Sequence, residues 1–235
     1  MPRTTGTNPD IPILFEDNHL LVVCKPVHVL SQQDHTGDPD LLTLCKAYLK
    51  KQHQKPGNVF LGLLHRLDRP VGGVMVLAKT SKAASRLSEQ IRQRSFQKRY
   101  LLVVKGQVPP NAVLVHHLLK DPDSNHVKVV SQRNKKAKKA ELSYLRLDYH
   151  PTRDLSLVKA NLITGRPHQI RVQFSVEGHP LLGDKKYGDP DDTTDSPALF
   201  ASGISFRHPT HGDTVRYTAS PPDTEPWKMF GQFRK

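Results

Sequence analysis

Alternating and continuous runs of hydrophobic residues predict a chain built mainly from short β-strands. Residues 140–148 and 154–162 alternate apolar and polar side chains with a period of two, as half-buried strands do. Residues 73–78 form a continuous apolar run, which is typical of a strand buried on both faces. Shorter β-rich runs closed by turn residues predict further strands at 19–24, 96–105, 113–119, 127–130, 199–206 and 214–218.

Helical spacing of apolar residues occurs in three segments. The first covers residues 40–52, and the segment from Asp38 to Asp40 supplies candidates for its N-cap. The second runs from Thr80 or Ser81, either of which can cap it, to about Arg94. Its buried stripe is expected to hold three apolar side chains, Ala84, Leu87 and Ile91.

The third helix is expected to start within residues 164–167, with Pro167 in its first turn, where a missing N–H costs nothing. Ile170 and Phe174, and less regularly Val176, supply its buried face. Strands dominate, and the helices do not alternate regularly with them, which argues against a doubly wound fold. The pattern predicts an α+β fold, in which helices pack on a mixed, mostly antiparallel central sheet.

Length and composition fit one domain with a short arm. The chain has 235 residues, and 36% of them are hydrophobic, which is enough for a core. The first ten residues are polar and contain Pro and Gly. We therefore expect a flexible arm over residues 1–12 and a single domain over residues 13–235.

The charge balance changes this picture more than the length does. Lys and Arg number 35 against 22 for Asp and Glu, so the formal net charge is +13. Such an excess favours polyanionic partners, above all nucleic acid, because cations release the counterions of a phosphate backbone. A basic protein with no such partner is the alternative.

Cysteines and hydropathy suggest a compartment. Cys24 and Cys45 lack the paired spacing of a zinc site or a disulfide framework, so we expect both to be core residues in a reducing environment. The N-terminal residues carry no apolar signal region, and no stretch approaches the roughly 18 apolar residues of a membrane span. The sequence therefore predicts a soluble, cytoplasmic protein, expected to be a monomer.

One short segment places an acid among bases. Residues 65–73 read HRLDRPVGG, so Asp68 lies close to His65, Arg66 and Arg69 just before the apolar run. A neighbouring guanidinium favours the ionised carboxylate, which can then act as a nucleophile or as an acid or base. A loop of solvated charges is the alternative for this segment taken alone.

Two further segments carry candidate chemistry. Arg99 and Tyr100 stand at the entry of an apolar strand, where a tyrosine can act as an acid or base or stack on a nucleobase, or simply pack on the sheet. Residues 164–171 read TGRPHQIR, and a helix N-terminus with such cations suits a phosphate or carboxylate. Arg166 and Arg171 are too far apart to share one helix face, so one could meet a backbone phosphate and the other a buried acid.

These segments occur in this order and at these intervals in one known family. With HRLD at 65–68, KRY at 98–100 and TGRPHQIR at 164–171, the sequence resembles the RluA-type RNA pseudouridine synthases. The resemblance runs from about Ile13 to about Pro221 and includes the segments EDNHLLVVCKP and GHPLLGDKKYG. It implies a mostly antiparallel sheet with an active-site cleft across its middle. We expect a stand-alone catalytic domain without the S4-like domain that many relatives carry.

The resemblance also implies roles for individual residues. Asp68 would be the catalytic aspartate, Tyr100 the tyrosine lying against the target base, and Arg171 the basic residue paired with Asp68. Arg66 would help to hold the RNA strand open around the flipped nucleotide. The other residues expected to contact RNA are His65, Arg69, Arg166 and His168.

The implied reaction isomerises specific uridines of ribosomal or transfer RNA. A C–N glycosidic bond breaks, the uracil turns, and a C–C bond forms through C5. No redox step and no outside group take part, so no cofactor is expected. Attack of Asp68 at the ribose C1′ and at the uracil C6 both remain open, and Asp68 and Tyr100 are the candidates for removing a proton. The target base must leave its stack, which costs least in a loop.

The match to the family has one departure. Val71, Gly72 and Gly73 stand where the family usually has Thr-Ser-Gly, so two hydroxyls and their hydrogen bonds are missing. We expect any misbuilding of the cleft to occur in this turn. It motivates an alternative function, a catalytically inactive RNA-binding or ribosome-assembly module on the same fold.

Two other groups of residues leave alternatives open. The basic run 133–139, with Lys135 and Lys136, is either an RNA contact or a solvated hairpin loop. Histidines at 116–117, 208 and 211 lack Cys or carboxylate neighbours at ligand spacing, so no metal site is expected.

Overall fold

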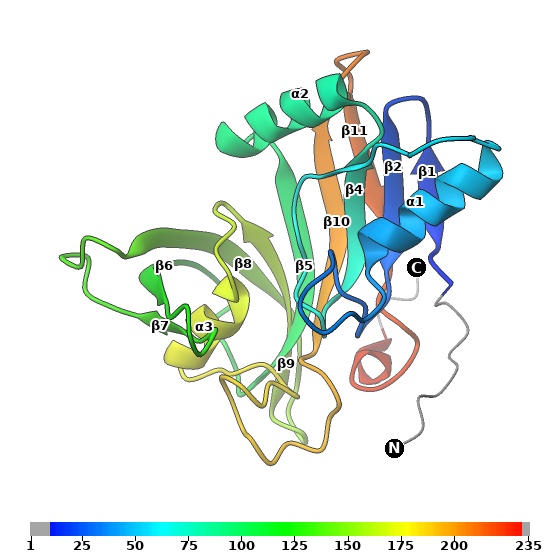
Figure 1. The fold of residues 1–235 in the computed structure, drawn as a ribbon. Helices are drawn as coiled ribbons and strands as arrows, with labels where there is room; N and C mark the ends of the chain where they lie inside the picture. The colour runs from blue at the N-terminus through cyan, green and yellow to red at the C-terminus, as the bar shows by residue number, and fades with distance from the viewer. Residues whose placement is uncertain (1–9, 232–235) are drawn as a thin grey trace. The chain divides into compact units, whose positions relative to one another are not determined.

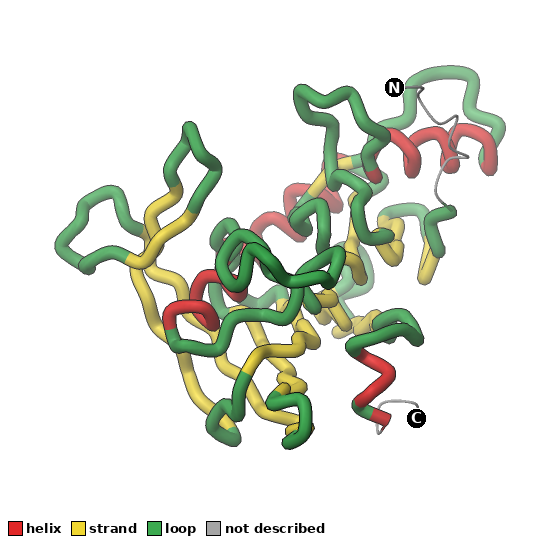
Figure 2. Tube along the Cα trace, turned by 90° about the horizontal axis from the view of Figure 1, so that it is seen from below, coloured by secondary structure: helices red, strands yellow, loops and turns green. Residues whose placement is uncertain are grey.

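The computed structural model describes residues 10–231, which divide into two compact units (Figure 1). Unit 1 consists of the chain through Phe96 together with 203–219, and unit 2 of 97–202 together with the chain from Ser220. Strands and loops form most of both units (Figure 2). The arm predicted for residues 1–12 lies outside the described residues except for its last three. The single domain over residues 13–235 stays a prediction.

Unit 1 is a small antiparallel sheet with helices packed on it. Its strands follow the order β1-β2-β4-β10, with β3 paired to β4 and β11 paired to β10. The ladders β1–β2, β2–β4, β3–β4 and β10–β11 are antiparallel. The bounds are β1 Ile13–Glu16, β2 Leu20–Lys25, β3 Gly62–Leu63, β4 Gly72–Ala78, β10 Leu199–Arg207 and β11 Thr214–Thr218. β10 contributes residues 203–207 to this unit.

The core of unit 1 lies where the sheet meets its second helix. The rings of Phe96 and Phe206 stack with centroids 5.1 Å apart, and Val22, Val76 and Leu87 are fully buried beside them. Burial of these large side chains stabilises the unit, since each contributes about 1.5–3 kcal/mol. The core therefore holds β4 rigidly, and β4 begins with the last two residues of the HRLDRPVGG segment.

Both helices of unit 1 are capped as the sequence predicts. α1 (Leu41–Gln52) begins after Asp40, whose carboxylate accepts the Thr43 N–H at 3.1 Å. α2 (Ser81–Arg92) begins after Thr80, whose hydroxyl accepts the Ala83 N–H at 3.2 Å. The buried stripe of α2 differs slightly from the prediction, because Ala83 is buried while Ala84 is only partly so.

Unit 2 is a longer sheet with strand order β5-β9-β8-β6-β7, and the ladders β5–β9, β9–β8, β8–β6 and β6–β7 are all antiparallel. α3 (Gln169–Val176) lies against β6 and β7 (Figure 1). Trp227 and Met229, in the short 3-10 helix η1 (Trp227–Met229), pack against the core cluster that contains Val103 and Leu157. The strand bounds are β5 Gln97–Lys105, β6 Asn111–Lys120, β7 Val127–Val129, β8 Lys138–His150 and β9 Leu155–Leu162. The predicted α+β class is confirmed.

α3 begins later than the sequence predicts. Its first residue is Gln169, after an N-cap, His168, with a φ of 51°. The Gln169 side-chain oxygen accepts the Thr164 hydroxyl at 2.8 Å and the Arg166 N–H at 3.0 Å. These bonds hold residues 164–166 as a turn, so Pro167 precedes the helix and is not in its first turn. Helical spacing could not reveal this, because the competing bonds come from one side chain.

The helices of the described chain do not meet what a membrane span requires. Among residues 10–231, no helix combines the length and the apolar character that crossing a bilayer requires.

Replacing Asp40 with alanine should lower the free energy of unfolding by about 1 kcal/mol, because the Thr43 N–H loses its acceptor. Asp40→Asn keeps a side-chain oxygen and should lose clearly less. Urea denaturation followed by circular dichroism measures both variants. Equal losses for the two would show that the cap bond contributes nothing.

Candidate active site

The segment that carries Asp68 is a tight turn anchored at two points. The Ser31 hydroxyl donates to the Leu67 carbonyl at 2.8 Å and accepts the Leu67 N–H at 3.1 Å. The Val71 N–H donates to the Asp68 carbonyl at 3.0 Å, which closes a four-residue β-turn. Leu67 and Val71 are both buried. Asp68 therefore sits at the first position of a turn whose flanks cannot move independently of the core.

A buried lysine lies directly behind this turn. The Lys25 ammonium donates to the carbonyls of Pro26 at 2.9 Å, Val29 at 2.6 Å and Arg69 at 3.2 Å. Its side chain is 1% exposed, and burial lowers the pKa of Lys25 to about 7, while the negative charge of Asp68 acts in the opposite direction. One ammonium thus joins the end of β2 to the turn that presents Asp68.

The same contacts explain how the turn closes without the hydroxyls that the family usually has. Gly73 has a φ of 127°, which a residue with a side chain rarely adopts. A Cβ at Gly72 would lie 3.2 Å from both the Lys25 carbonyl oxygen and a methyl of Val27. The backbone bond to Val71 and the Lys25 ammonium hold the turn instead.

The three basic residues of the segment are in different situations. The His65 Nε2 accepts the Val76 N–H at 3.2 Å, and its ring packs on Phe96, so His65 helps to fasten the segment to β4. Arg69 forms a half-exposed ion pair with Asp38 at 2.6 Å. The exposed Arg66 guanidinium forms no hydrogen bond or ion pair with any other residue of the described chain. Of the two arginines, Arg69 is therefore neutralised by a protein acid, whereas the charge of Arg66 is available to a ligand.

Tyr100 lies in unit 2, in the middle of β5. It is 7% exposed and pairs with Ala160 of β9 in the sheet register. Because side chains alternate along a strand, Tyr100 shares one face with Lys98 and Leu102. A tyrosine so deeply set has a fixed ring, which suits a role against a flat substrate group.

Arg171 is held by a partner that the sequence analysis did not single out. Its Nε and Nη2 donate to the two carboxylate oxygens of Asp184, each at 2.7 Å. The Asp184 side chain is fully buried and also accepts the N–H groups of Lys186 and Tyr187 at 3.1 Å. The buried acid expected for one of the two arginines is thus Asp184. The pairing of Arg171 with Asp68, which belongs to the other unit, stays a prediction.

Tyr187 connects this ion pair to the basic surface of unit 2. Its ring lies under the Arg171 guanidinium at 5.1 Å, and its hydroxyl accepts the Val127 N–H at 3.0 Å and contacts the His168 Nδ1. Arg166 donates from Nε to the Lys139 carbonyl at 2.9 Å. His168 and Arg166 are therefore both tied to the strands that border the basic loop.

The basic loop itself connects β7 to β8. Asn134 shapes it, since its side chain accepts the Lys136 N–H at 3.0 Å and its carbonyl accepts the Ala137 N–H at 2.9 Å. Lys135 and Lys136 are exposed, and within residues 10–231 their ammonium groups form no ion pair. The loop thus presents unneutralised positive charge, while both alternatives for it, RNA contact and solvation, remain open.

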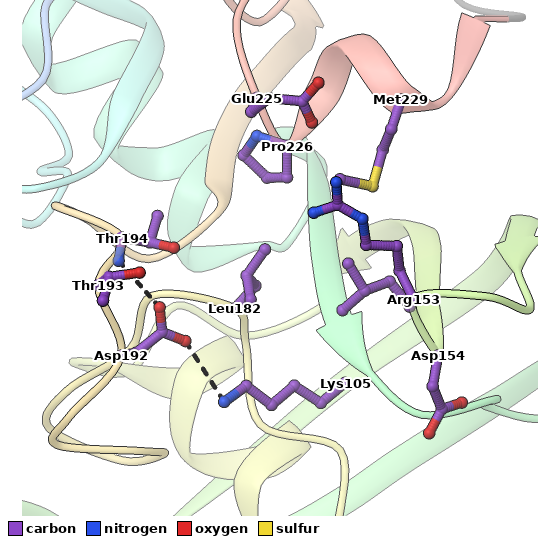
Figure 3. A pocket seen from close by; sticks show the side chains of 11 residues that line it. Lys105, Arg153, Asp154, Leu182, Asp192, Thr193, Thr194, Glu225, Pro226 and Met229 are labelled. Carbon is purple, nitrogen blue, oxygen red and sulfur yellow. Dashed lines mark hydrogen bonds and ion pairs between the residues drawn. The ribbon is translucent and has the colours of Figure 1, made fainter.

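Unit 2 also contains a cavity of about 460 Å³ that no predicted site residue lines (Figure 3). The Lys105 ammonium points at Asp192 and lies 3.2–3.3 Å from the carboxylates of Asp189 and Asp192 (Figure 3). Leu155, Leu182 and other apolar groups form much of the remaining wall. The carboxylates neutralise the lysine of this cavity, and Arg153 is a second cation in its wall.

The histidines set aside as metal ligands do have acidic neighbours in space. His208 lies 2.9 Å from Asp17, and His116 lies 3.2 Å from Glu177. The expectation that they lack carboxylate company therefore holds only along the sequence. In the described part of the chain, no three or more His, Cys, Asp or Glu residues gather as a metal site requires.

Lys25→Met should make stability less dependent on pH. The folded pKa of about 7 is below the unfolded value near about 10.4, so the unfolded chain binds more protons in between, and wild-type stability rises with pH through this window. The loss caused by Lys25→Met should thus be larger at pH 9 than at pH 7 by about 2 kcal/mol. Chemical denaturation at both pH values tests this, with the exposed Lys82→Met as control; an equal loss at both would contradict it.

Asp184→Asn should destabilise the protein by about 3 kcal/mol or more, because the Arg171 guanidinium keeps its charge but loses its buried counter-ion. Adding Arg171→Met to this variant should restore part of the loss. Thermal and urea unfolding of the single and double variants give the coupling energy. A double variant as unstable as the sum of the two single ones would rule out a direct ion-pair contribution.

Comparison with known proteins shows which proteins this chain is similar to. The family model described as RNA pseudouridylate synthase matches residues 19–176, which include Asp68, Tyr100 and Arg171. Among curated proteins, the chain is 36% identical to ribosomal large subunit pseudouridine synthase C of Pasteurella multocida over 95% of this chain and 68% of that protein. It is 33% identical to ribosomal large subunit pseudouridine synthase D of Zymomonas mobilis over 94% and 74%. The chain spans about two thirds of the length of such relatives; for synthase C of Haemophilus influenzae it covers 64%.

Solved structures agree on the fold. Human RNA pseudouridylate synthase domain containing 4 superposes with a TM-score of 0.74 at 24% identity, covering 90% of this chain and 88% of that one. Human RNA pseudouridylate synthase domain containing 1 has a TM-score of 0.72 at 21% identity, covering 94% and 88%. The family expected from three short motifs is thus confirmed by matches over nearly the whole chain: this protein belongs to the RNA pseudouridylate synthase family.

Proposed function

We propose that this protein converts specific uridines of structured RNA to pseudouridine, with Asp68 as the nucleophile. The observation that carries this proposal is the anchored turn: Ser31 holds Leu67, and the buried Lys25 ammonium holds the Arg69 carbonyl, on either side of Asp68. A nucleophile gains most when its direction is set before the substrate arrives. The anchored backbone on both sides of Asp68 supports this role, although the two hydroxyls usual in the family are missing.

The reaction needs a fixed carboxylate, a group against the base and a cation fixed in direction. Asp68 attacks C1′ or C6, and the C1′–N1 bond breaks with its electron pair remaining on the uracil. The uracil then turns and C5 bonds to C1′. The bond that Asp68 formed to C1′ or C6 breaks with its electron pair returning to the carboxylate. Asp68 or Tyr100 removes the proton from C5, and N1 gains one. Asp184 fixes the direction of the Arg171 guanidinium through two hydrogen bonds. We propose that this guanidinium also faces the Asp68 carboxylate. None of these steps calls for an oxidant or an outside group.

RNA binding is proposed to use the cations that protein acids do not neutralise. Arg66 on the turn and Lys135 and Lys136 on the β7–β8 loop are exposed, whereas Arg69 is paired with Asp38. The excess of 35 basic over 22 acidic residues supports attraction to a phosphate backbone. Arg66 would hold the strand around a flipped uridine, and Arg166 and His168 would support the backbone beside it.

The proposed substrate is large-subunit ribosomal RNA. Several relatives are named as ribosomal large subunit pseudouridine synthases, and the catalytic segments lie in the matched part of the chain. Transfer RNA is the second candidate, because its loops also present unstacked uridines. The monomeric state and the cytoplasmic location stay predictions.

The alternative of an inactive RNA-binding module rested on the departure at Val71 and Gly72. The turn closes through the Val71 N–H and the Lys25 ammonium, so the missing hydroxyls leave no gap that would disable Asp68. The geometry therefore favours the enzyme over the module.

Asp68→Asn should abolish pseudouridine formation, with a loss of about 10³-fold or more, and leave RNA affinity within a few fold. The amide keeps the size of the side chain but cannot act as a nucleophile. Tritium release from RNA labelled at uridine C5 measures the reaction, and filter binding measures affinity. Asp34→Asn, an exposed acid of the same unit, is the matched control. Turnover by Asp68→Asn near the wild-type rate would overturn the proposal.

The substrate is tested in the same system. A pseudouridine map of total RNA with and without the gene should lose a site in large-subunit ribosomal RNA. Loss of a transfer RNA site instead would reassign the substrate, and no lost site together with inactive purified protein would favour the binding module.

A further inference from the structure

One lysine of unit 2 is desolvated without a visible compensating group. Lys98 lies on β5 two residues before Tyr100, so both side chains emerge on the same face, about 7 Å apart along the strand. Its ammonium reaches the turn at Gly165, where a Cβ would lie only 2.9 Å from the Lys98 Nζ. The glycine of the TGRP segment therefore leaves room for this ammonium.

Three other buried or partly buried lysines show what Lys98 lacks. Lys25 donates to three carbonyls, Lys79 pairs with Glu16 at 2.6 Å, and Lys105 pairs with Asp189 and Asp192. Within residues 10–231, Lys98 forms neither a hydrogen bond nor an ion pair. Burial alone lowers the pKa of its ammonium, while the side chain stays partly exposed. Since an uncompensated cation in such a place costs folding free energy, an approaching ligand is the natural source of its counter-charge.

We propose that the Lys98 ammonium contacts a carbonyl oxygen of the target uracil and stabilises the negative charge that develops there during isomerisation. This inference rests on the proposed function and adds a substrate-contacting residue to it. Tyr100, on the same face of β5, is the residue expected against the base, which places the same base within reach of a lysine two positions away.

Either route of the reaction puts charge where Lys98 can meet it. If C1′–N1 breaks first, its electron pair stays on N1 and spreads over O2 and O4. If Asp68 adds to C6, the pair of the C5–C6 double bond moves onto O4 instead. The charge disappears when C5 bonds to C1′. C5 then loses its proton while N1 gains one, and on the C6 route the Asp68–C6 bond breaks with its electron pair returning to the carboxylate. Lys98 itself makes and breaks no bond. A fixed donor aimed at such an oxygen in a low-dielectric site contributes about 10²–10³-fold in rate.

An RNA phosphate is the other anionic oxygen that could meet this ammonium, and kinetics separate the two. A phosphate contact acts on affinity and reduces the salt dependence of binding, whereas a contact to uracil acts on the chemical step. The measurements are therefore the single-turnover rate at saturating protein, and the affinity at several salt concentrations, on the RNA that the wild-type protein modifies.

Four variants test the proposal. Lys98→Met removes the charge at similar volume, and Lys98→Arg keeps the charge. Gly165→Ala keeps Lys98 but pushes its ammonium aside, since the new Cβ would lie 2.9 Å from Nζ. Lys82→Met, an exposed lysine of α2, removes the same charge elsewhere. Thermal unfolding of each variant establishes that it is folded.

The expected result is a fall of about 10²-fold or more in the single-turnover rate of Lys98→Met, with affinity and salt dependence within about threefold of wild type. Lys98→Arg should recover part of the rate, Gly165→Ala should lose about tenfold, and Lys82→Met should lose nothing. Replacing O2 or O4 of the target uridine by sulfur, a poorer acceptor, should slow the wild type more than Lys98→Met.

Two outcomes would overturn this inference while leaving the proposed function intact. A Lys98→Met protein with the wild-type rate but weaker, less salt-dependent binding would assign the ammonium to a phosphate. Wild-type rate and affinity together would show that it meets no ligand. Failure of the proposed function itself would look different, because the wild-type protein would then form no pseudouridine at all. If Lys98→Met does not fold, Gly165→Ala and the sulfur-substituted uridines still decide the question.

Discussion

The candidate site depends first on one buried ammonium. Lys25 is the last residue of β2, and its ammonium donates to three backbone carbonyls. One of these carbonyls, that of Arg69, belongs to the turn that carries Asp68. An ammonium in the interior is costly unless its donors are used, so its position can hardly vary without breaking several bonds at once. That constraint holds the turn where two side-chain hydroxyls are missing. Hydrogen bonds to backbone groups of the turn, and not hydroxyls at residues 71 and 72, therefore hold the segment that carries Asp68.

A second theme is the division of the many basic side chains into neutralised and available ones. Asp184 binds Arg171 bidentately, and Asp38 and Asp189 meet Arg69 and Lys105. Such pairs fix structure, and the exposed ones contribute little stability in water. Among the cations of the described chain without an acidic partner, Arg66 lies on the turn that carries Asp68, and Lys98 lies on the strand that carries Tyr100. The net charge of +13 says nothing about this division, because it counts paired and unpaired cations alike.

Local elements were largely predictable, and the errors have local causes. α1 and α2 begin directly after Asp40 and Thr80, because a side-chain oxygen that caps the first turn favours a helix start next to an apolar stripe. α3 starts late because the Gln169 side chain binds the preceding turn, a competition that periodicity does not encode. The short strands β1 and β3 were not predicted, since few residues carry little pattern and pairing with a neighbour makes them strands.

The sequence by itself determined the family, the fold class and the identity of the candidate site residues, because motifs and hydrophobic periods are local properties of a chain. Only the tertiary structure decided the partners: Lys25 meets Arg69 and Ser31 meets Leu67 across 44 and 36 positions, and Arg171 meets Asp184. Such pairs depend on strand register and on the space around each group. They anchor the turn that carries Asp68 and leave Lys98 a cation without a protein counter-charge among the described residues.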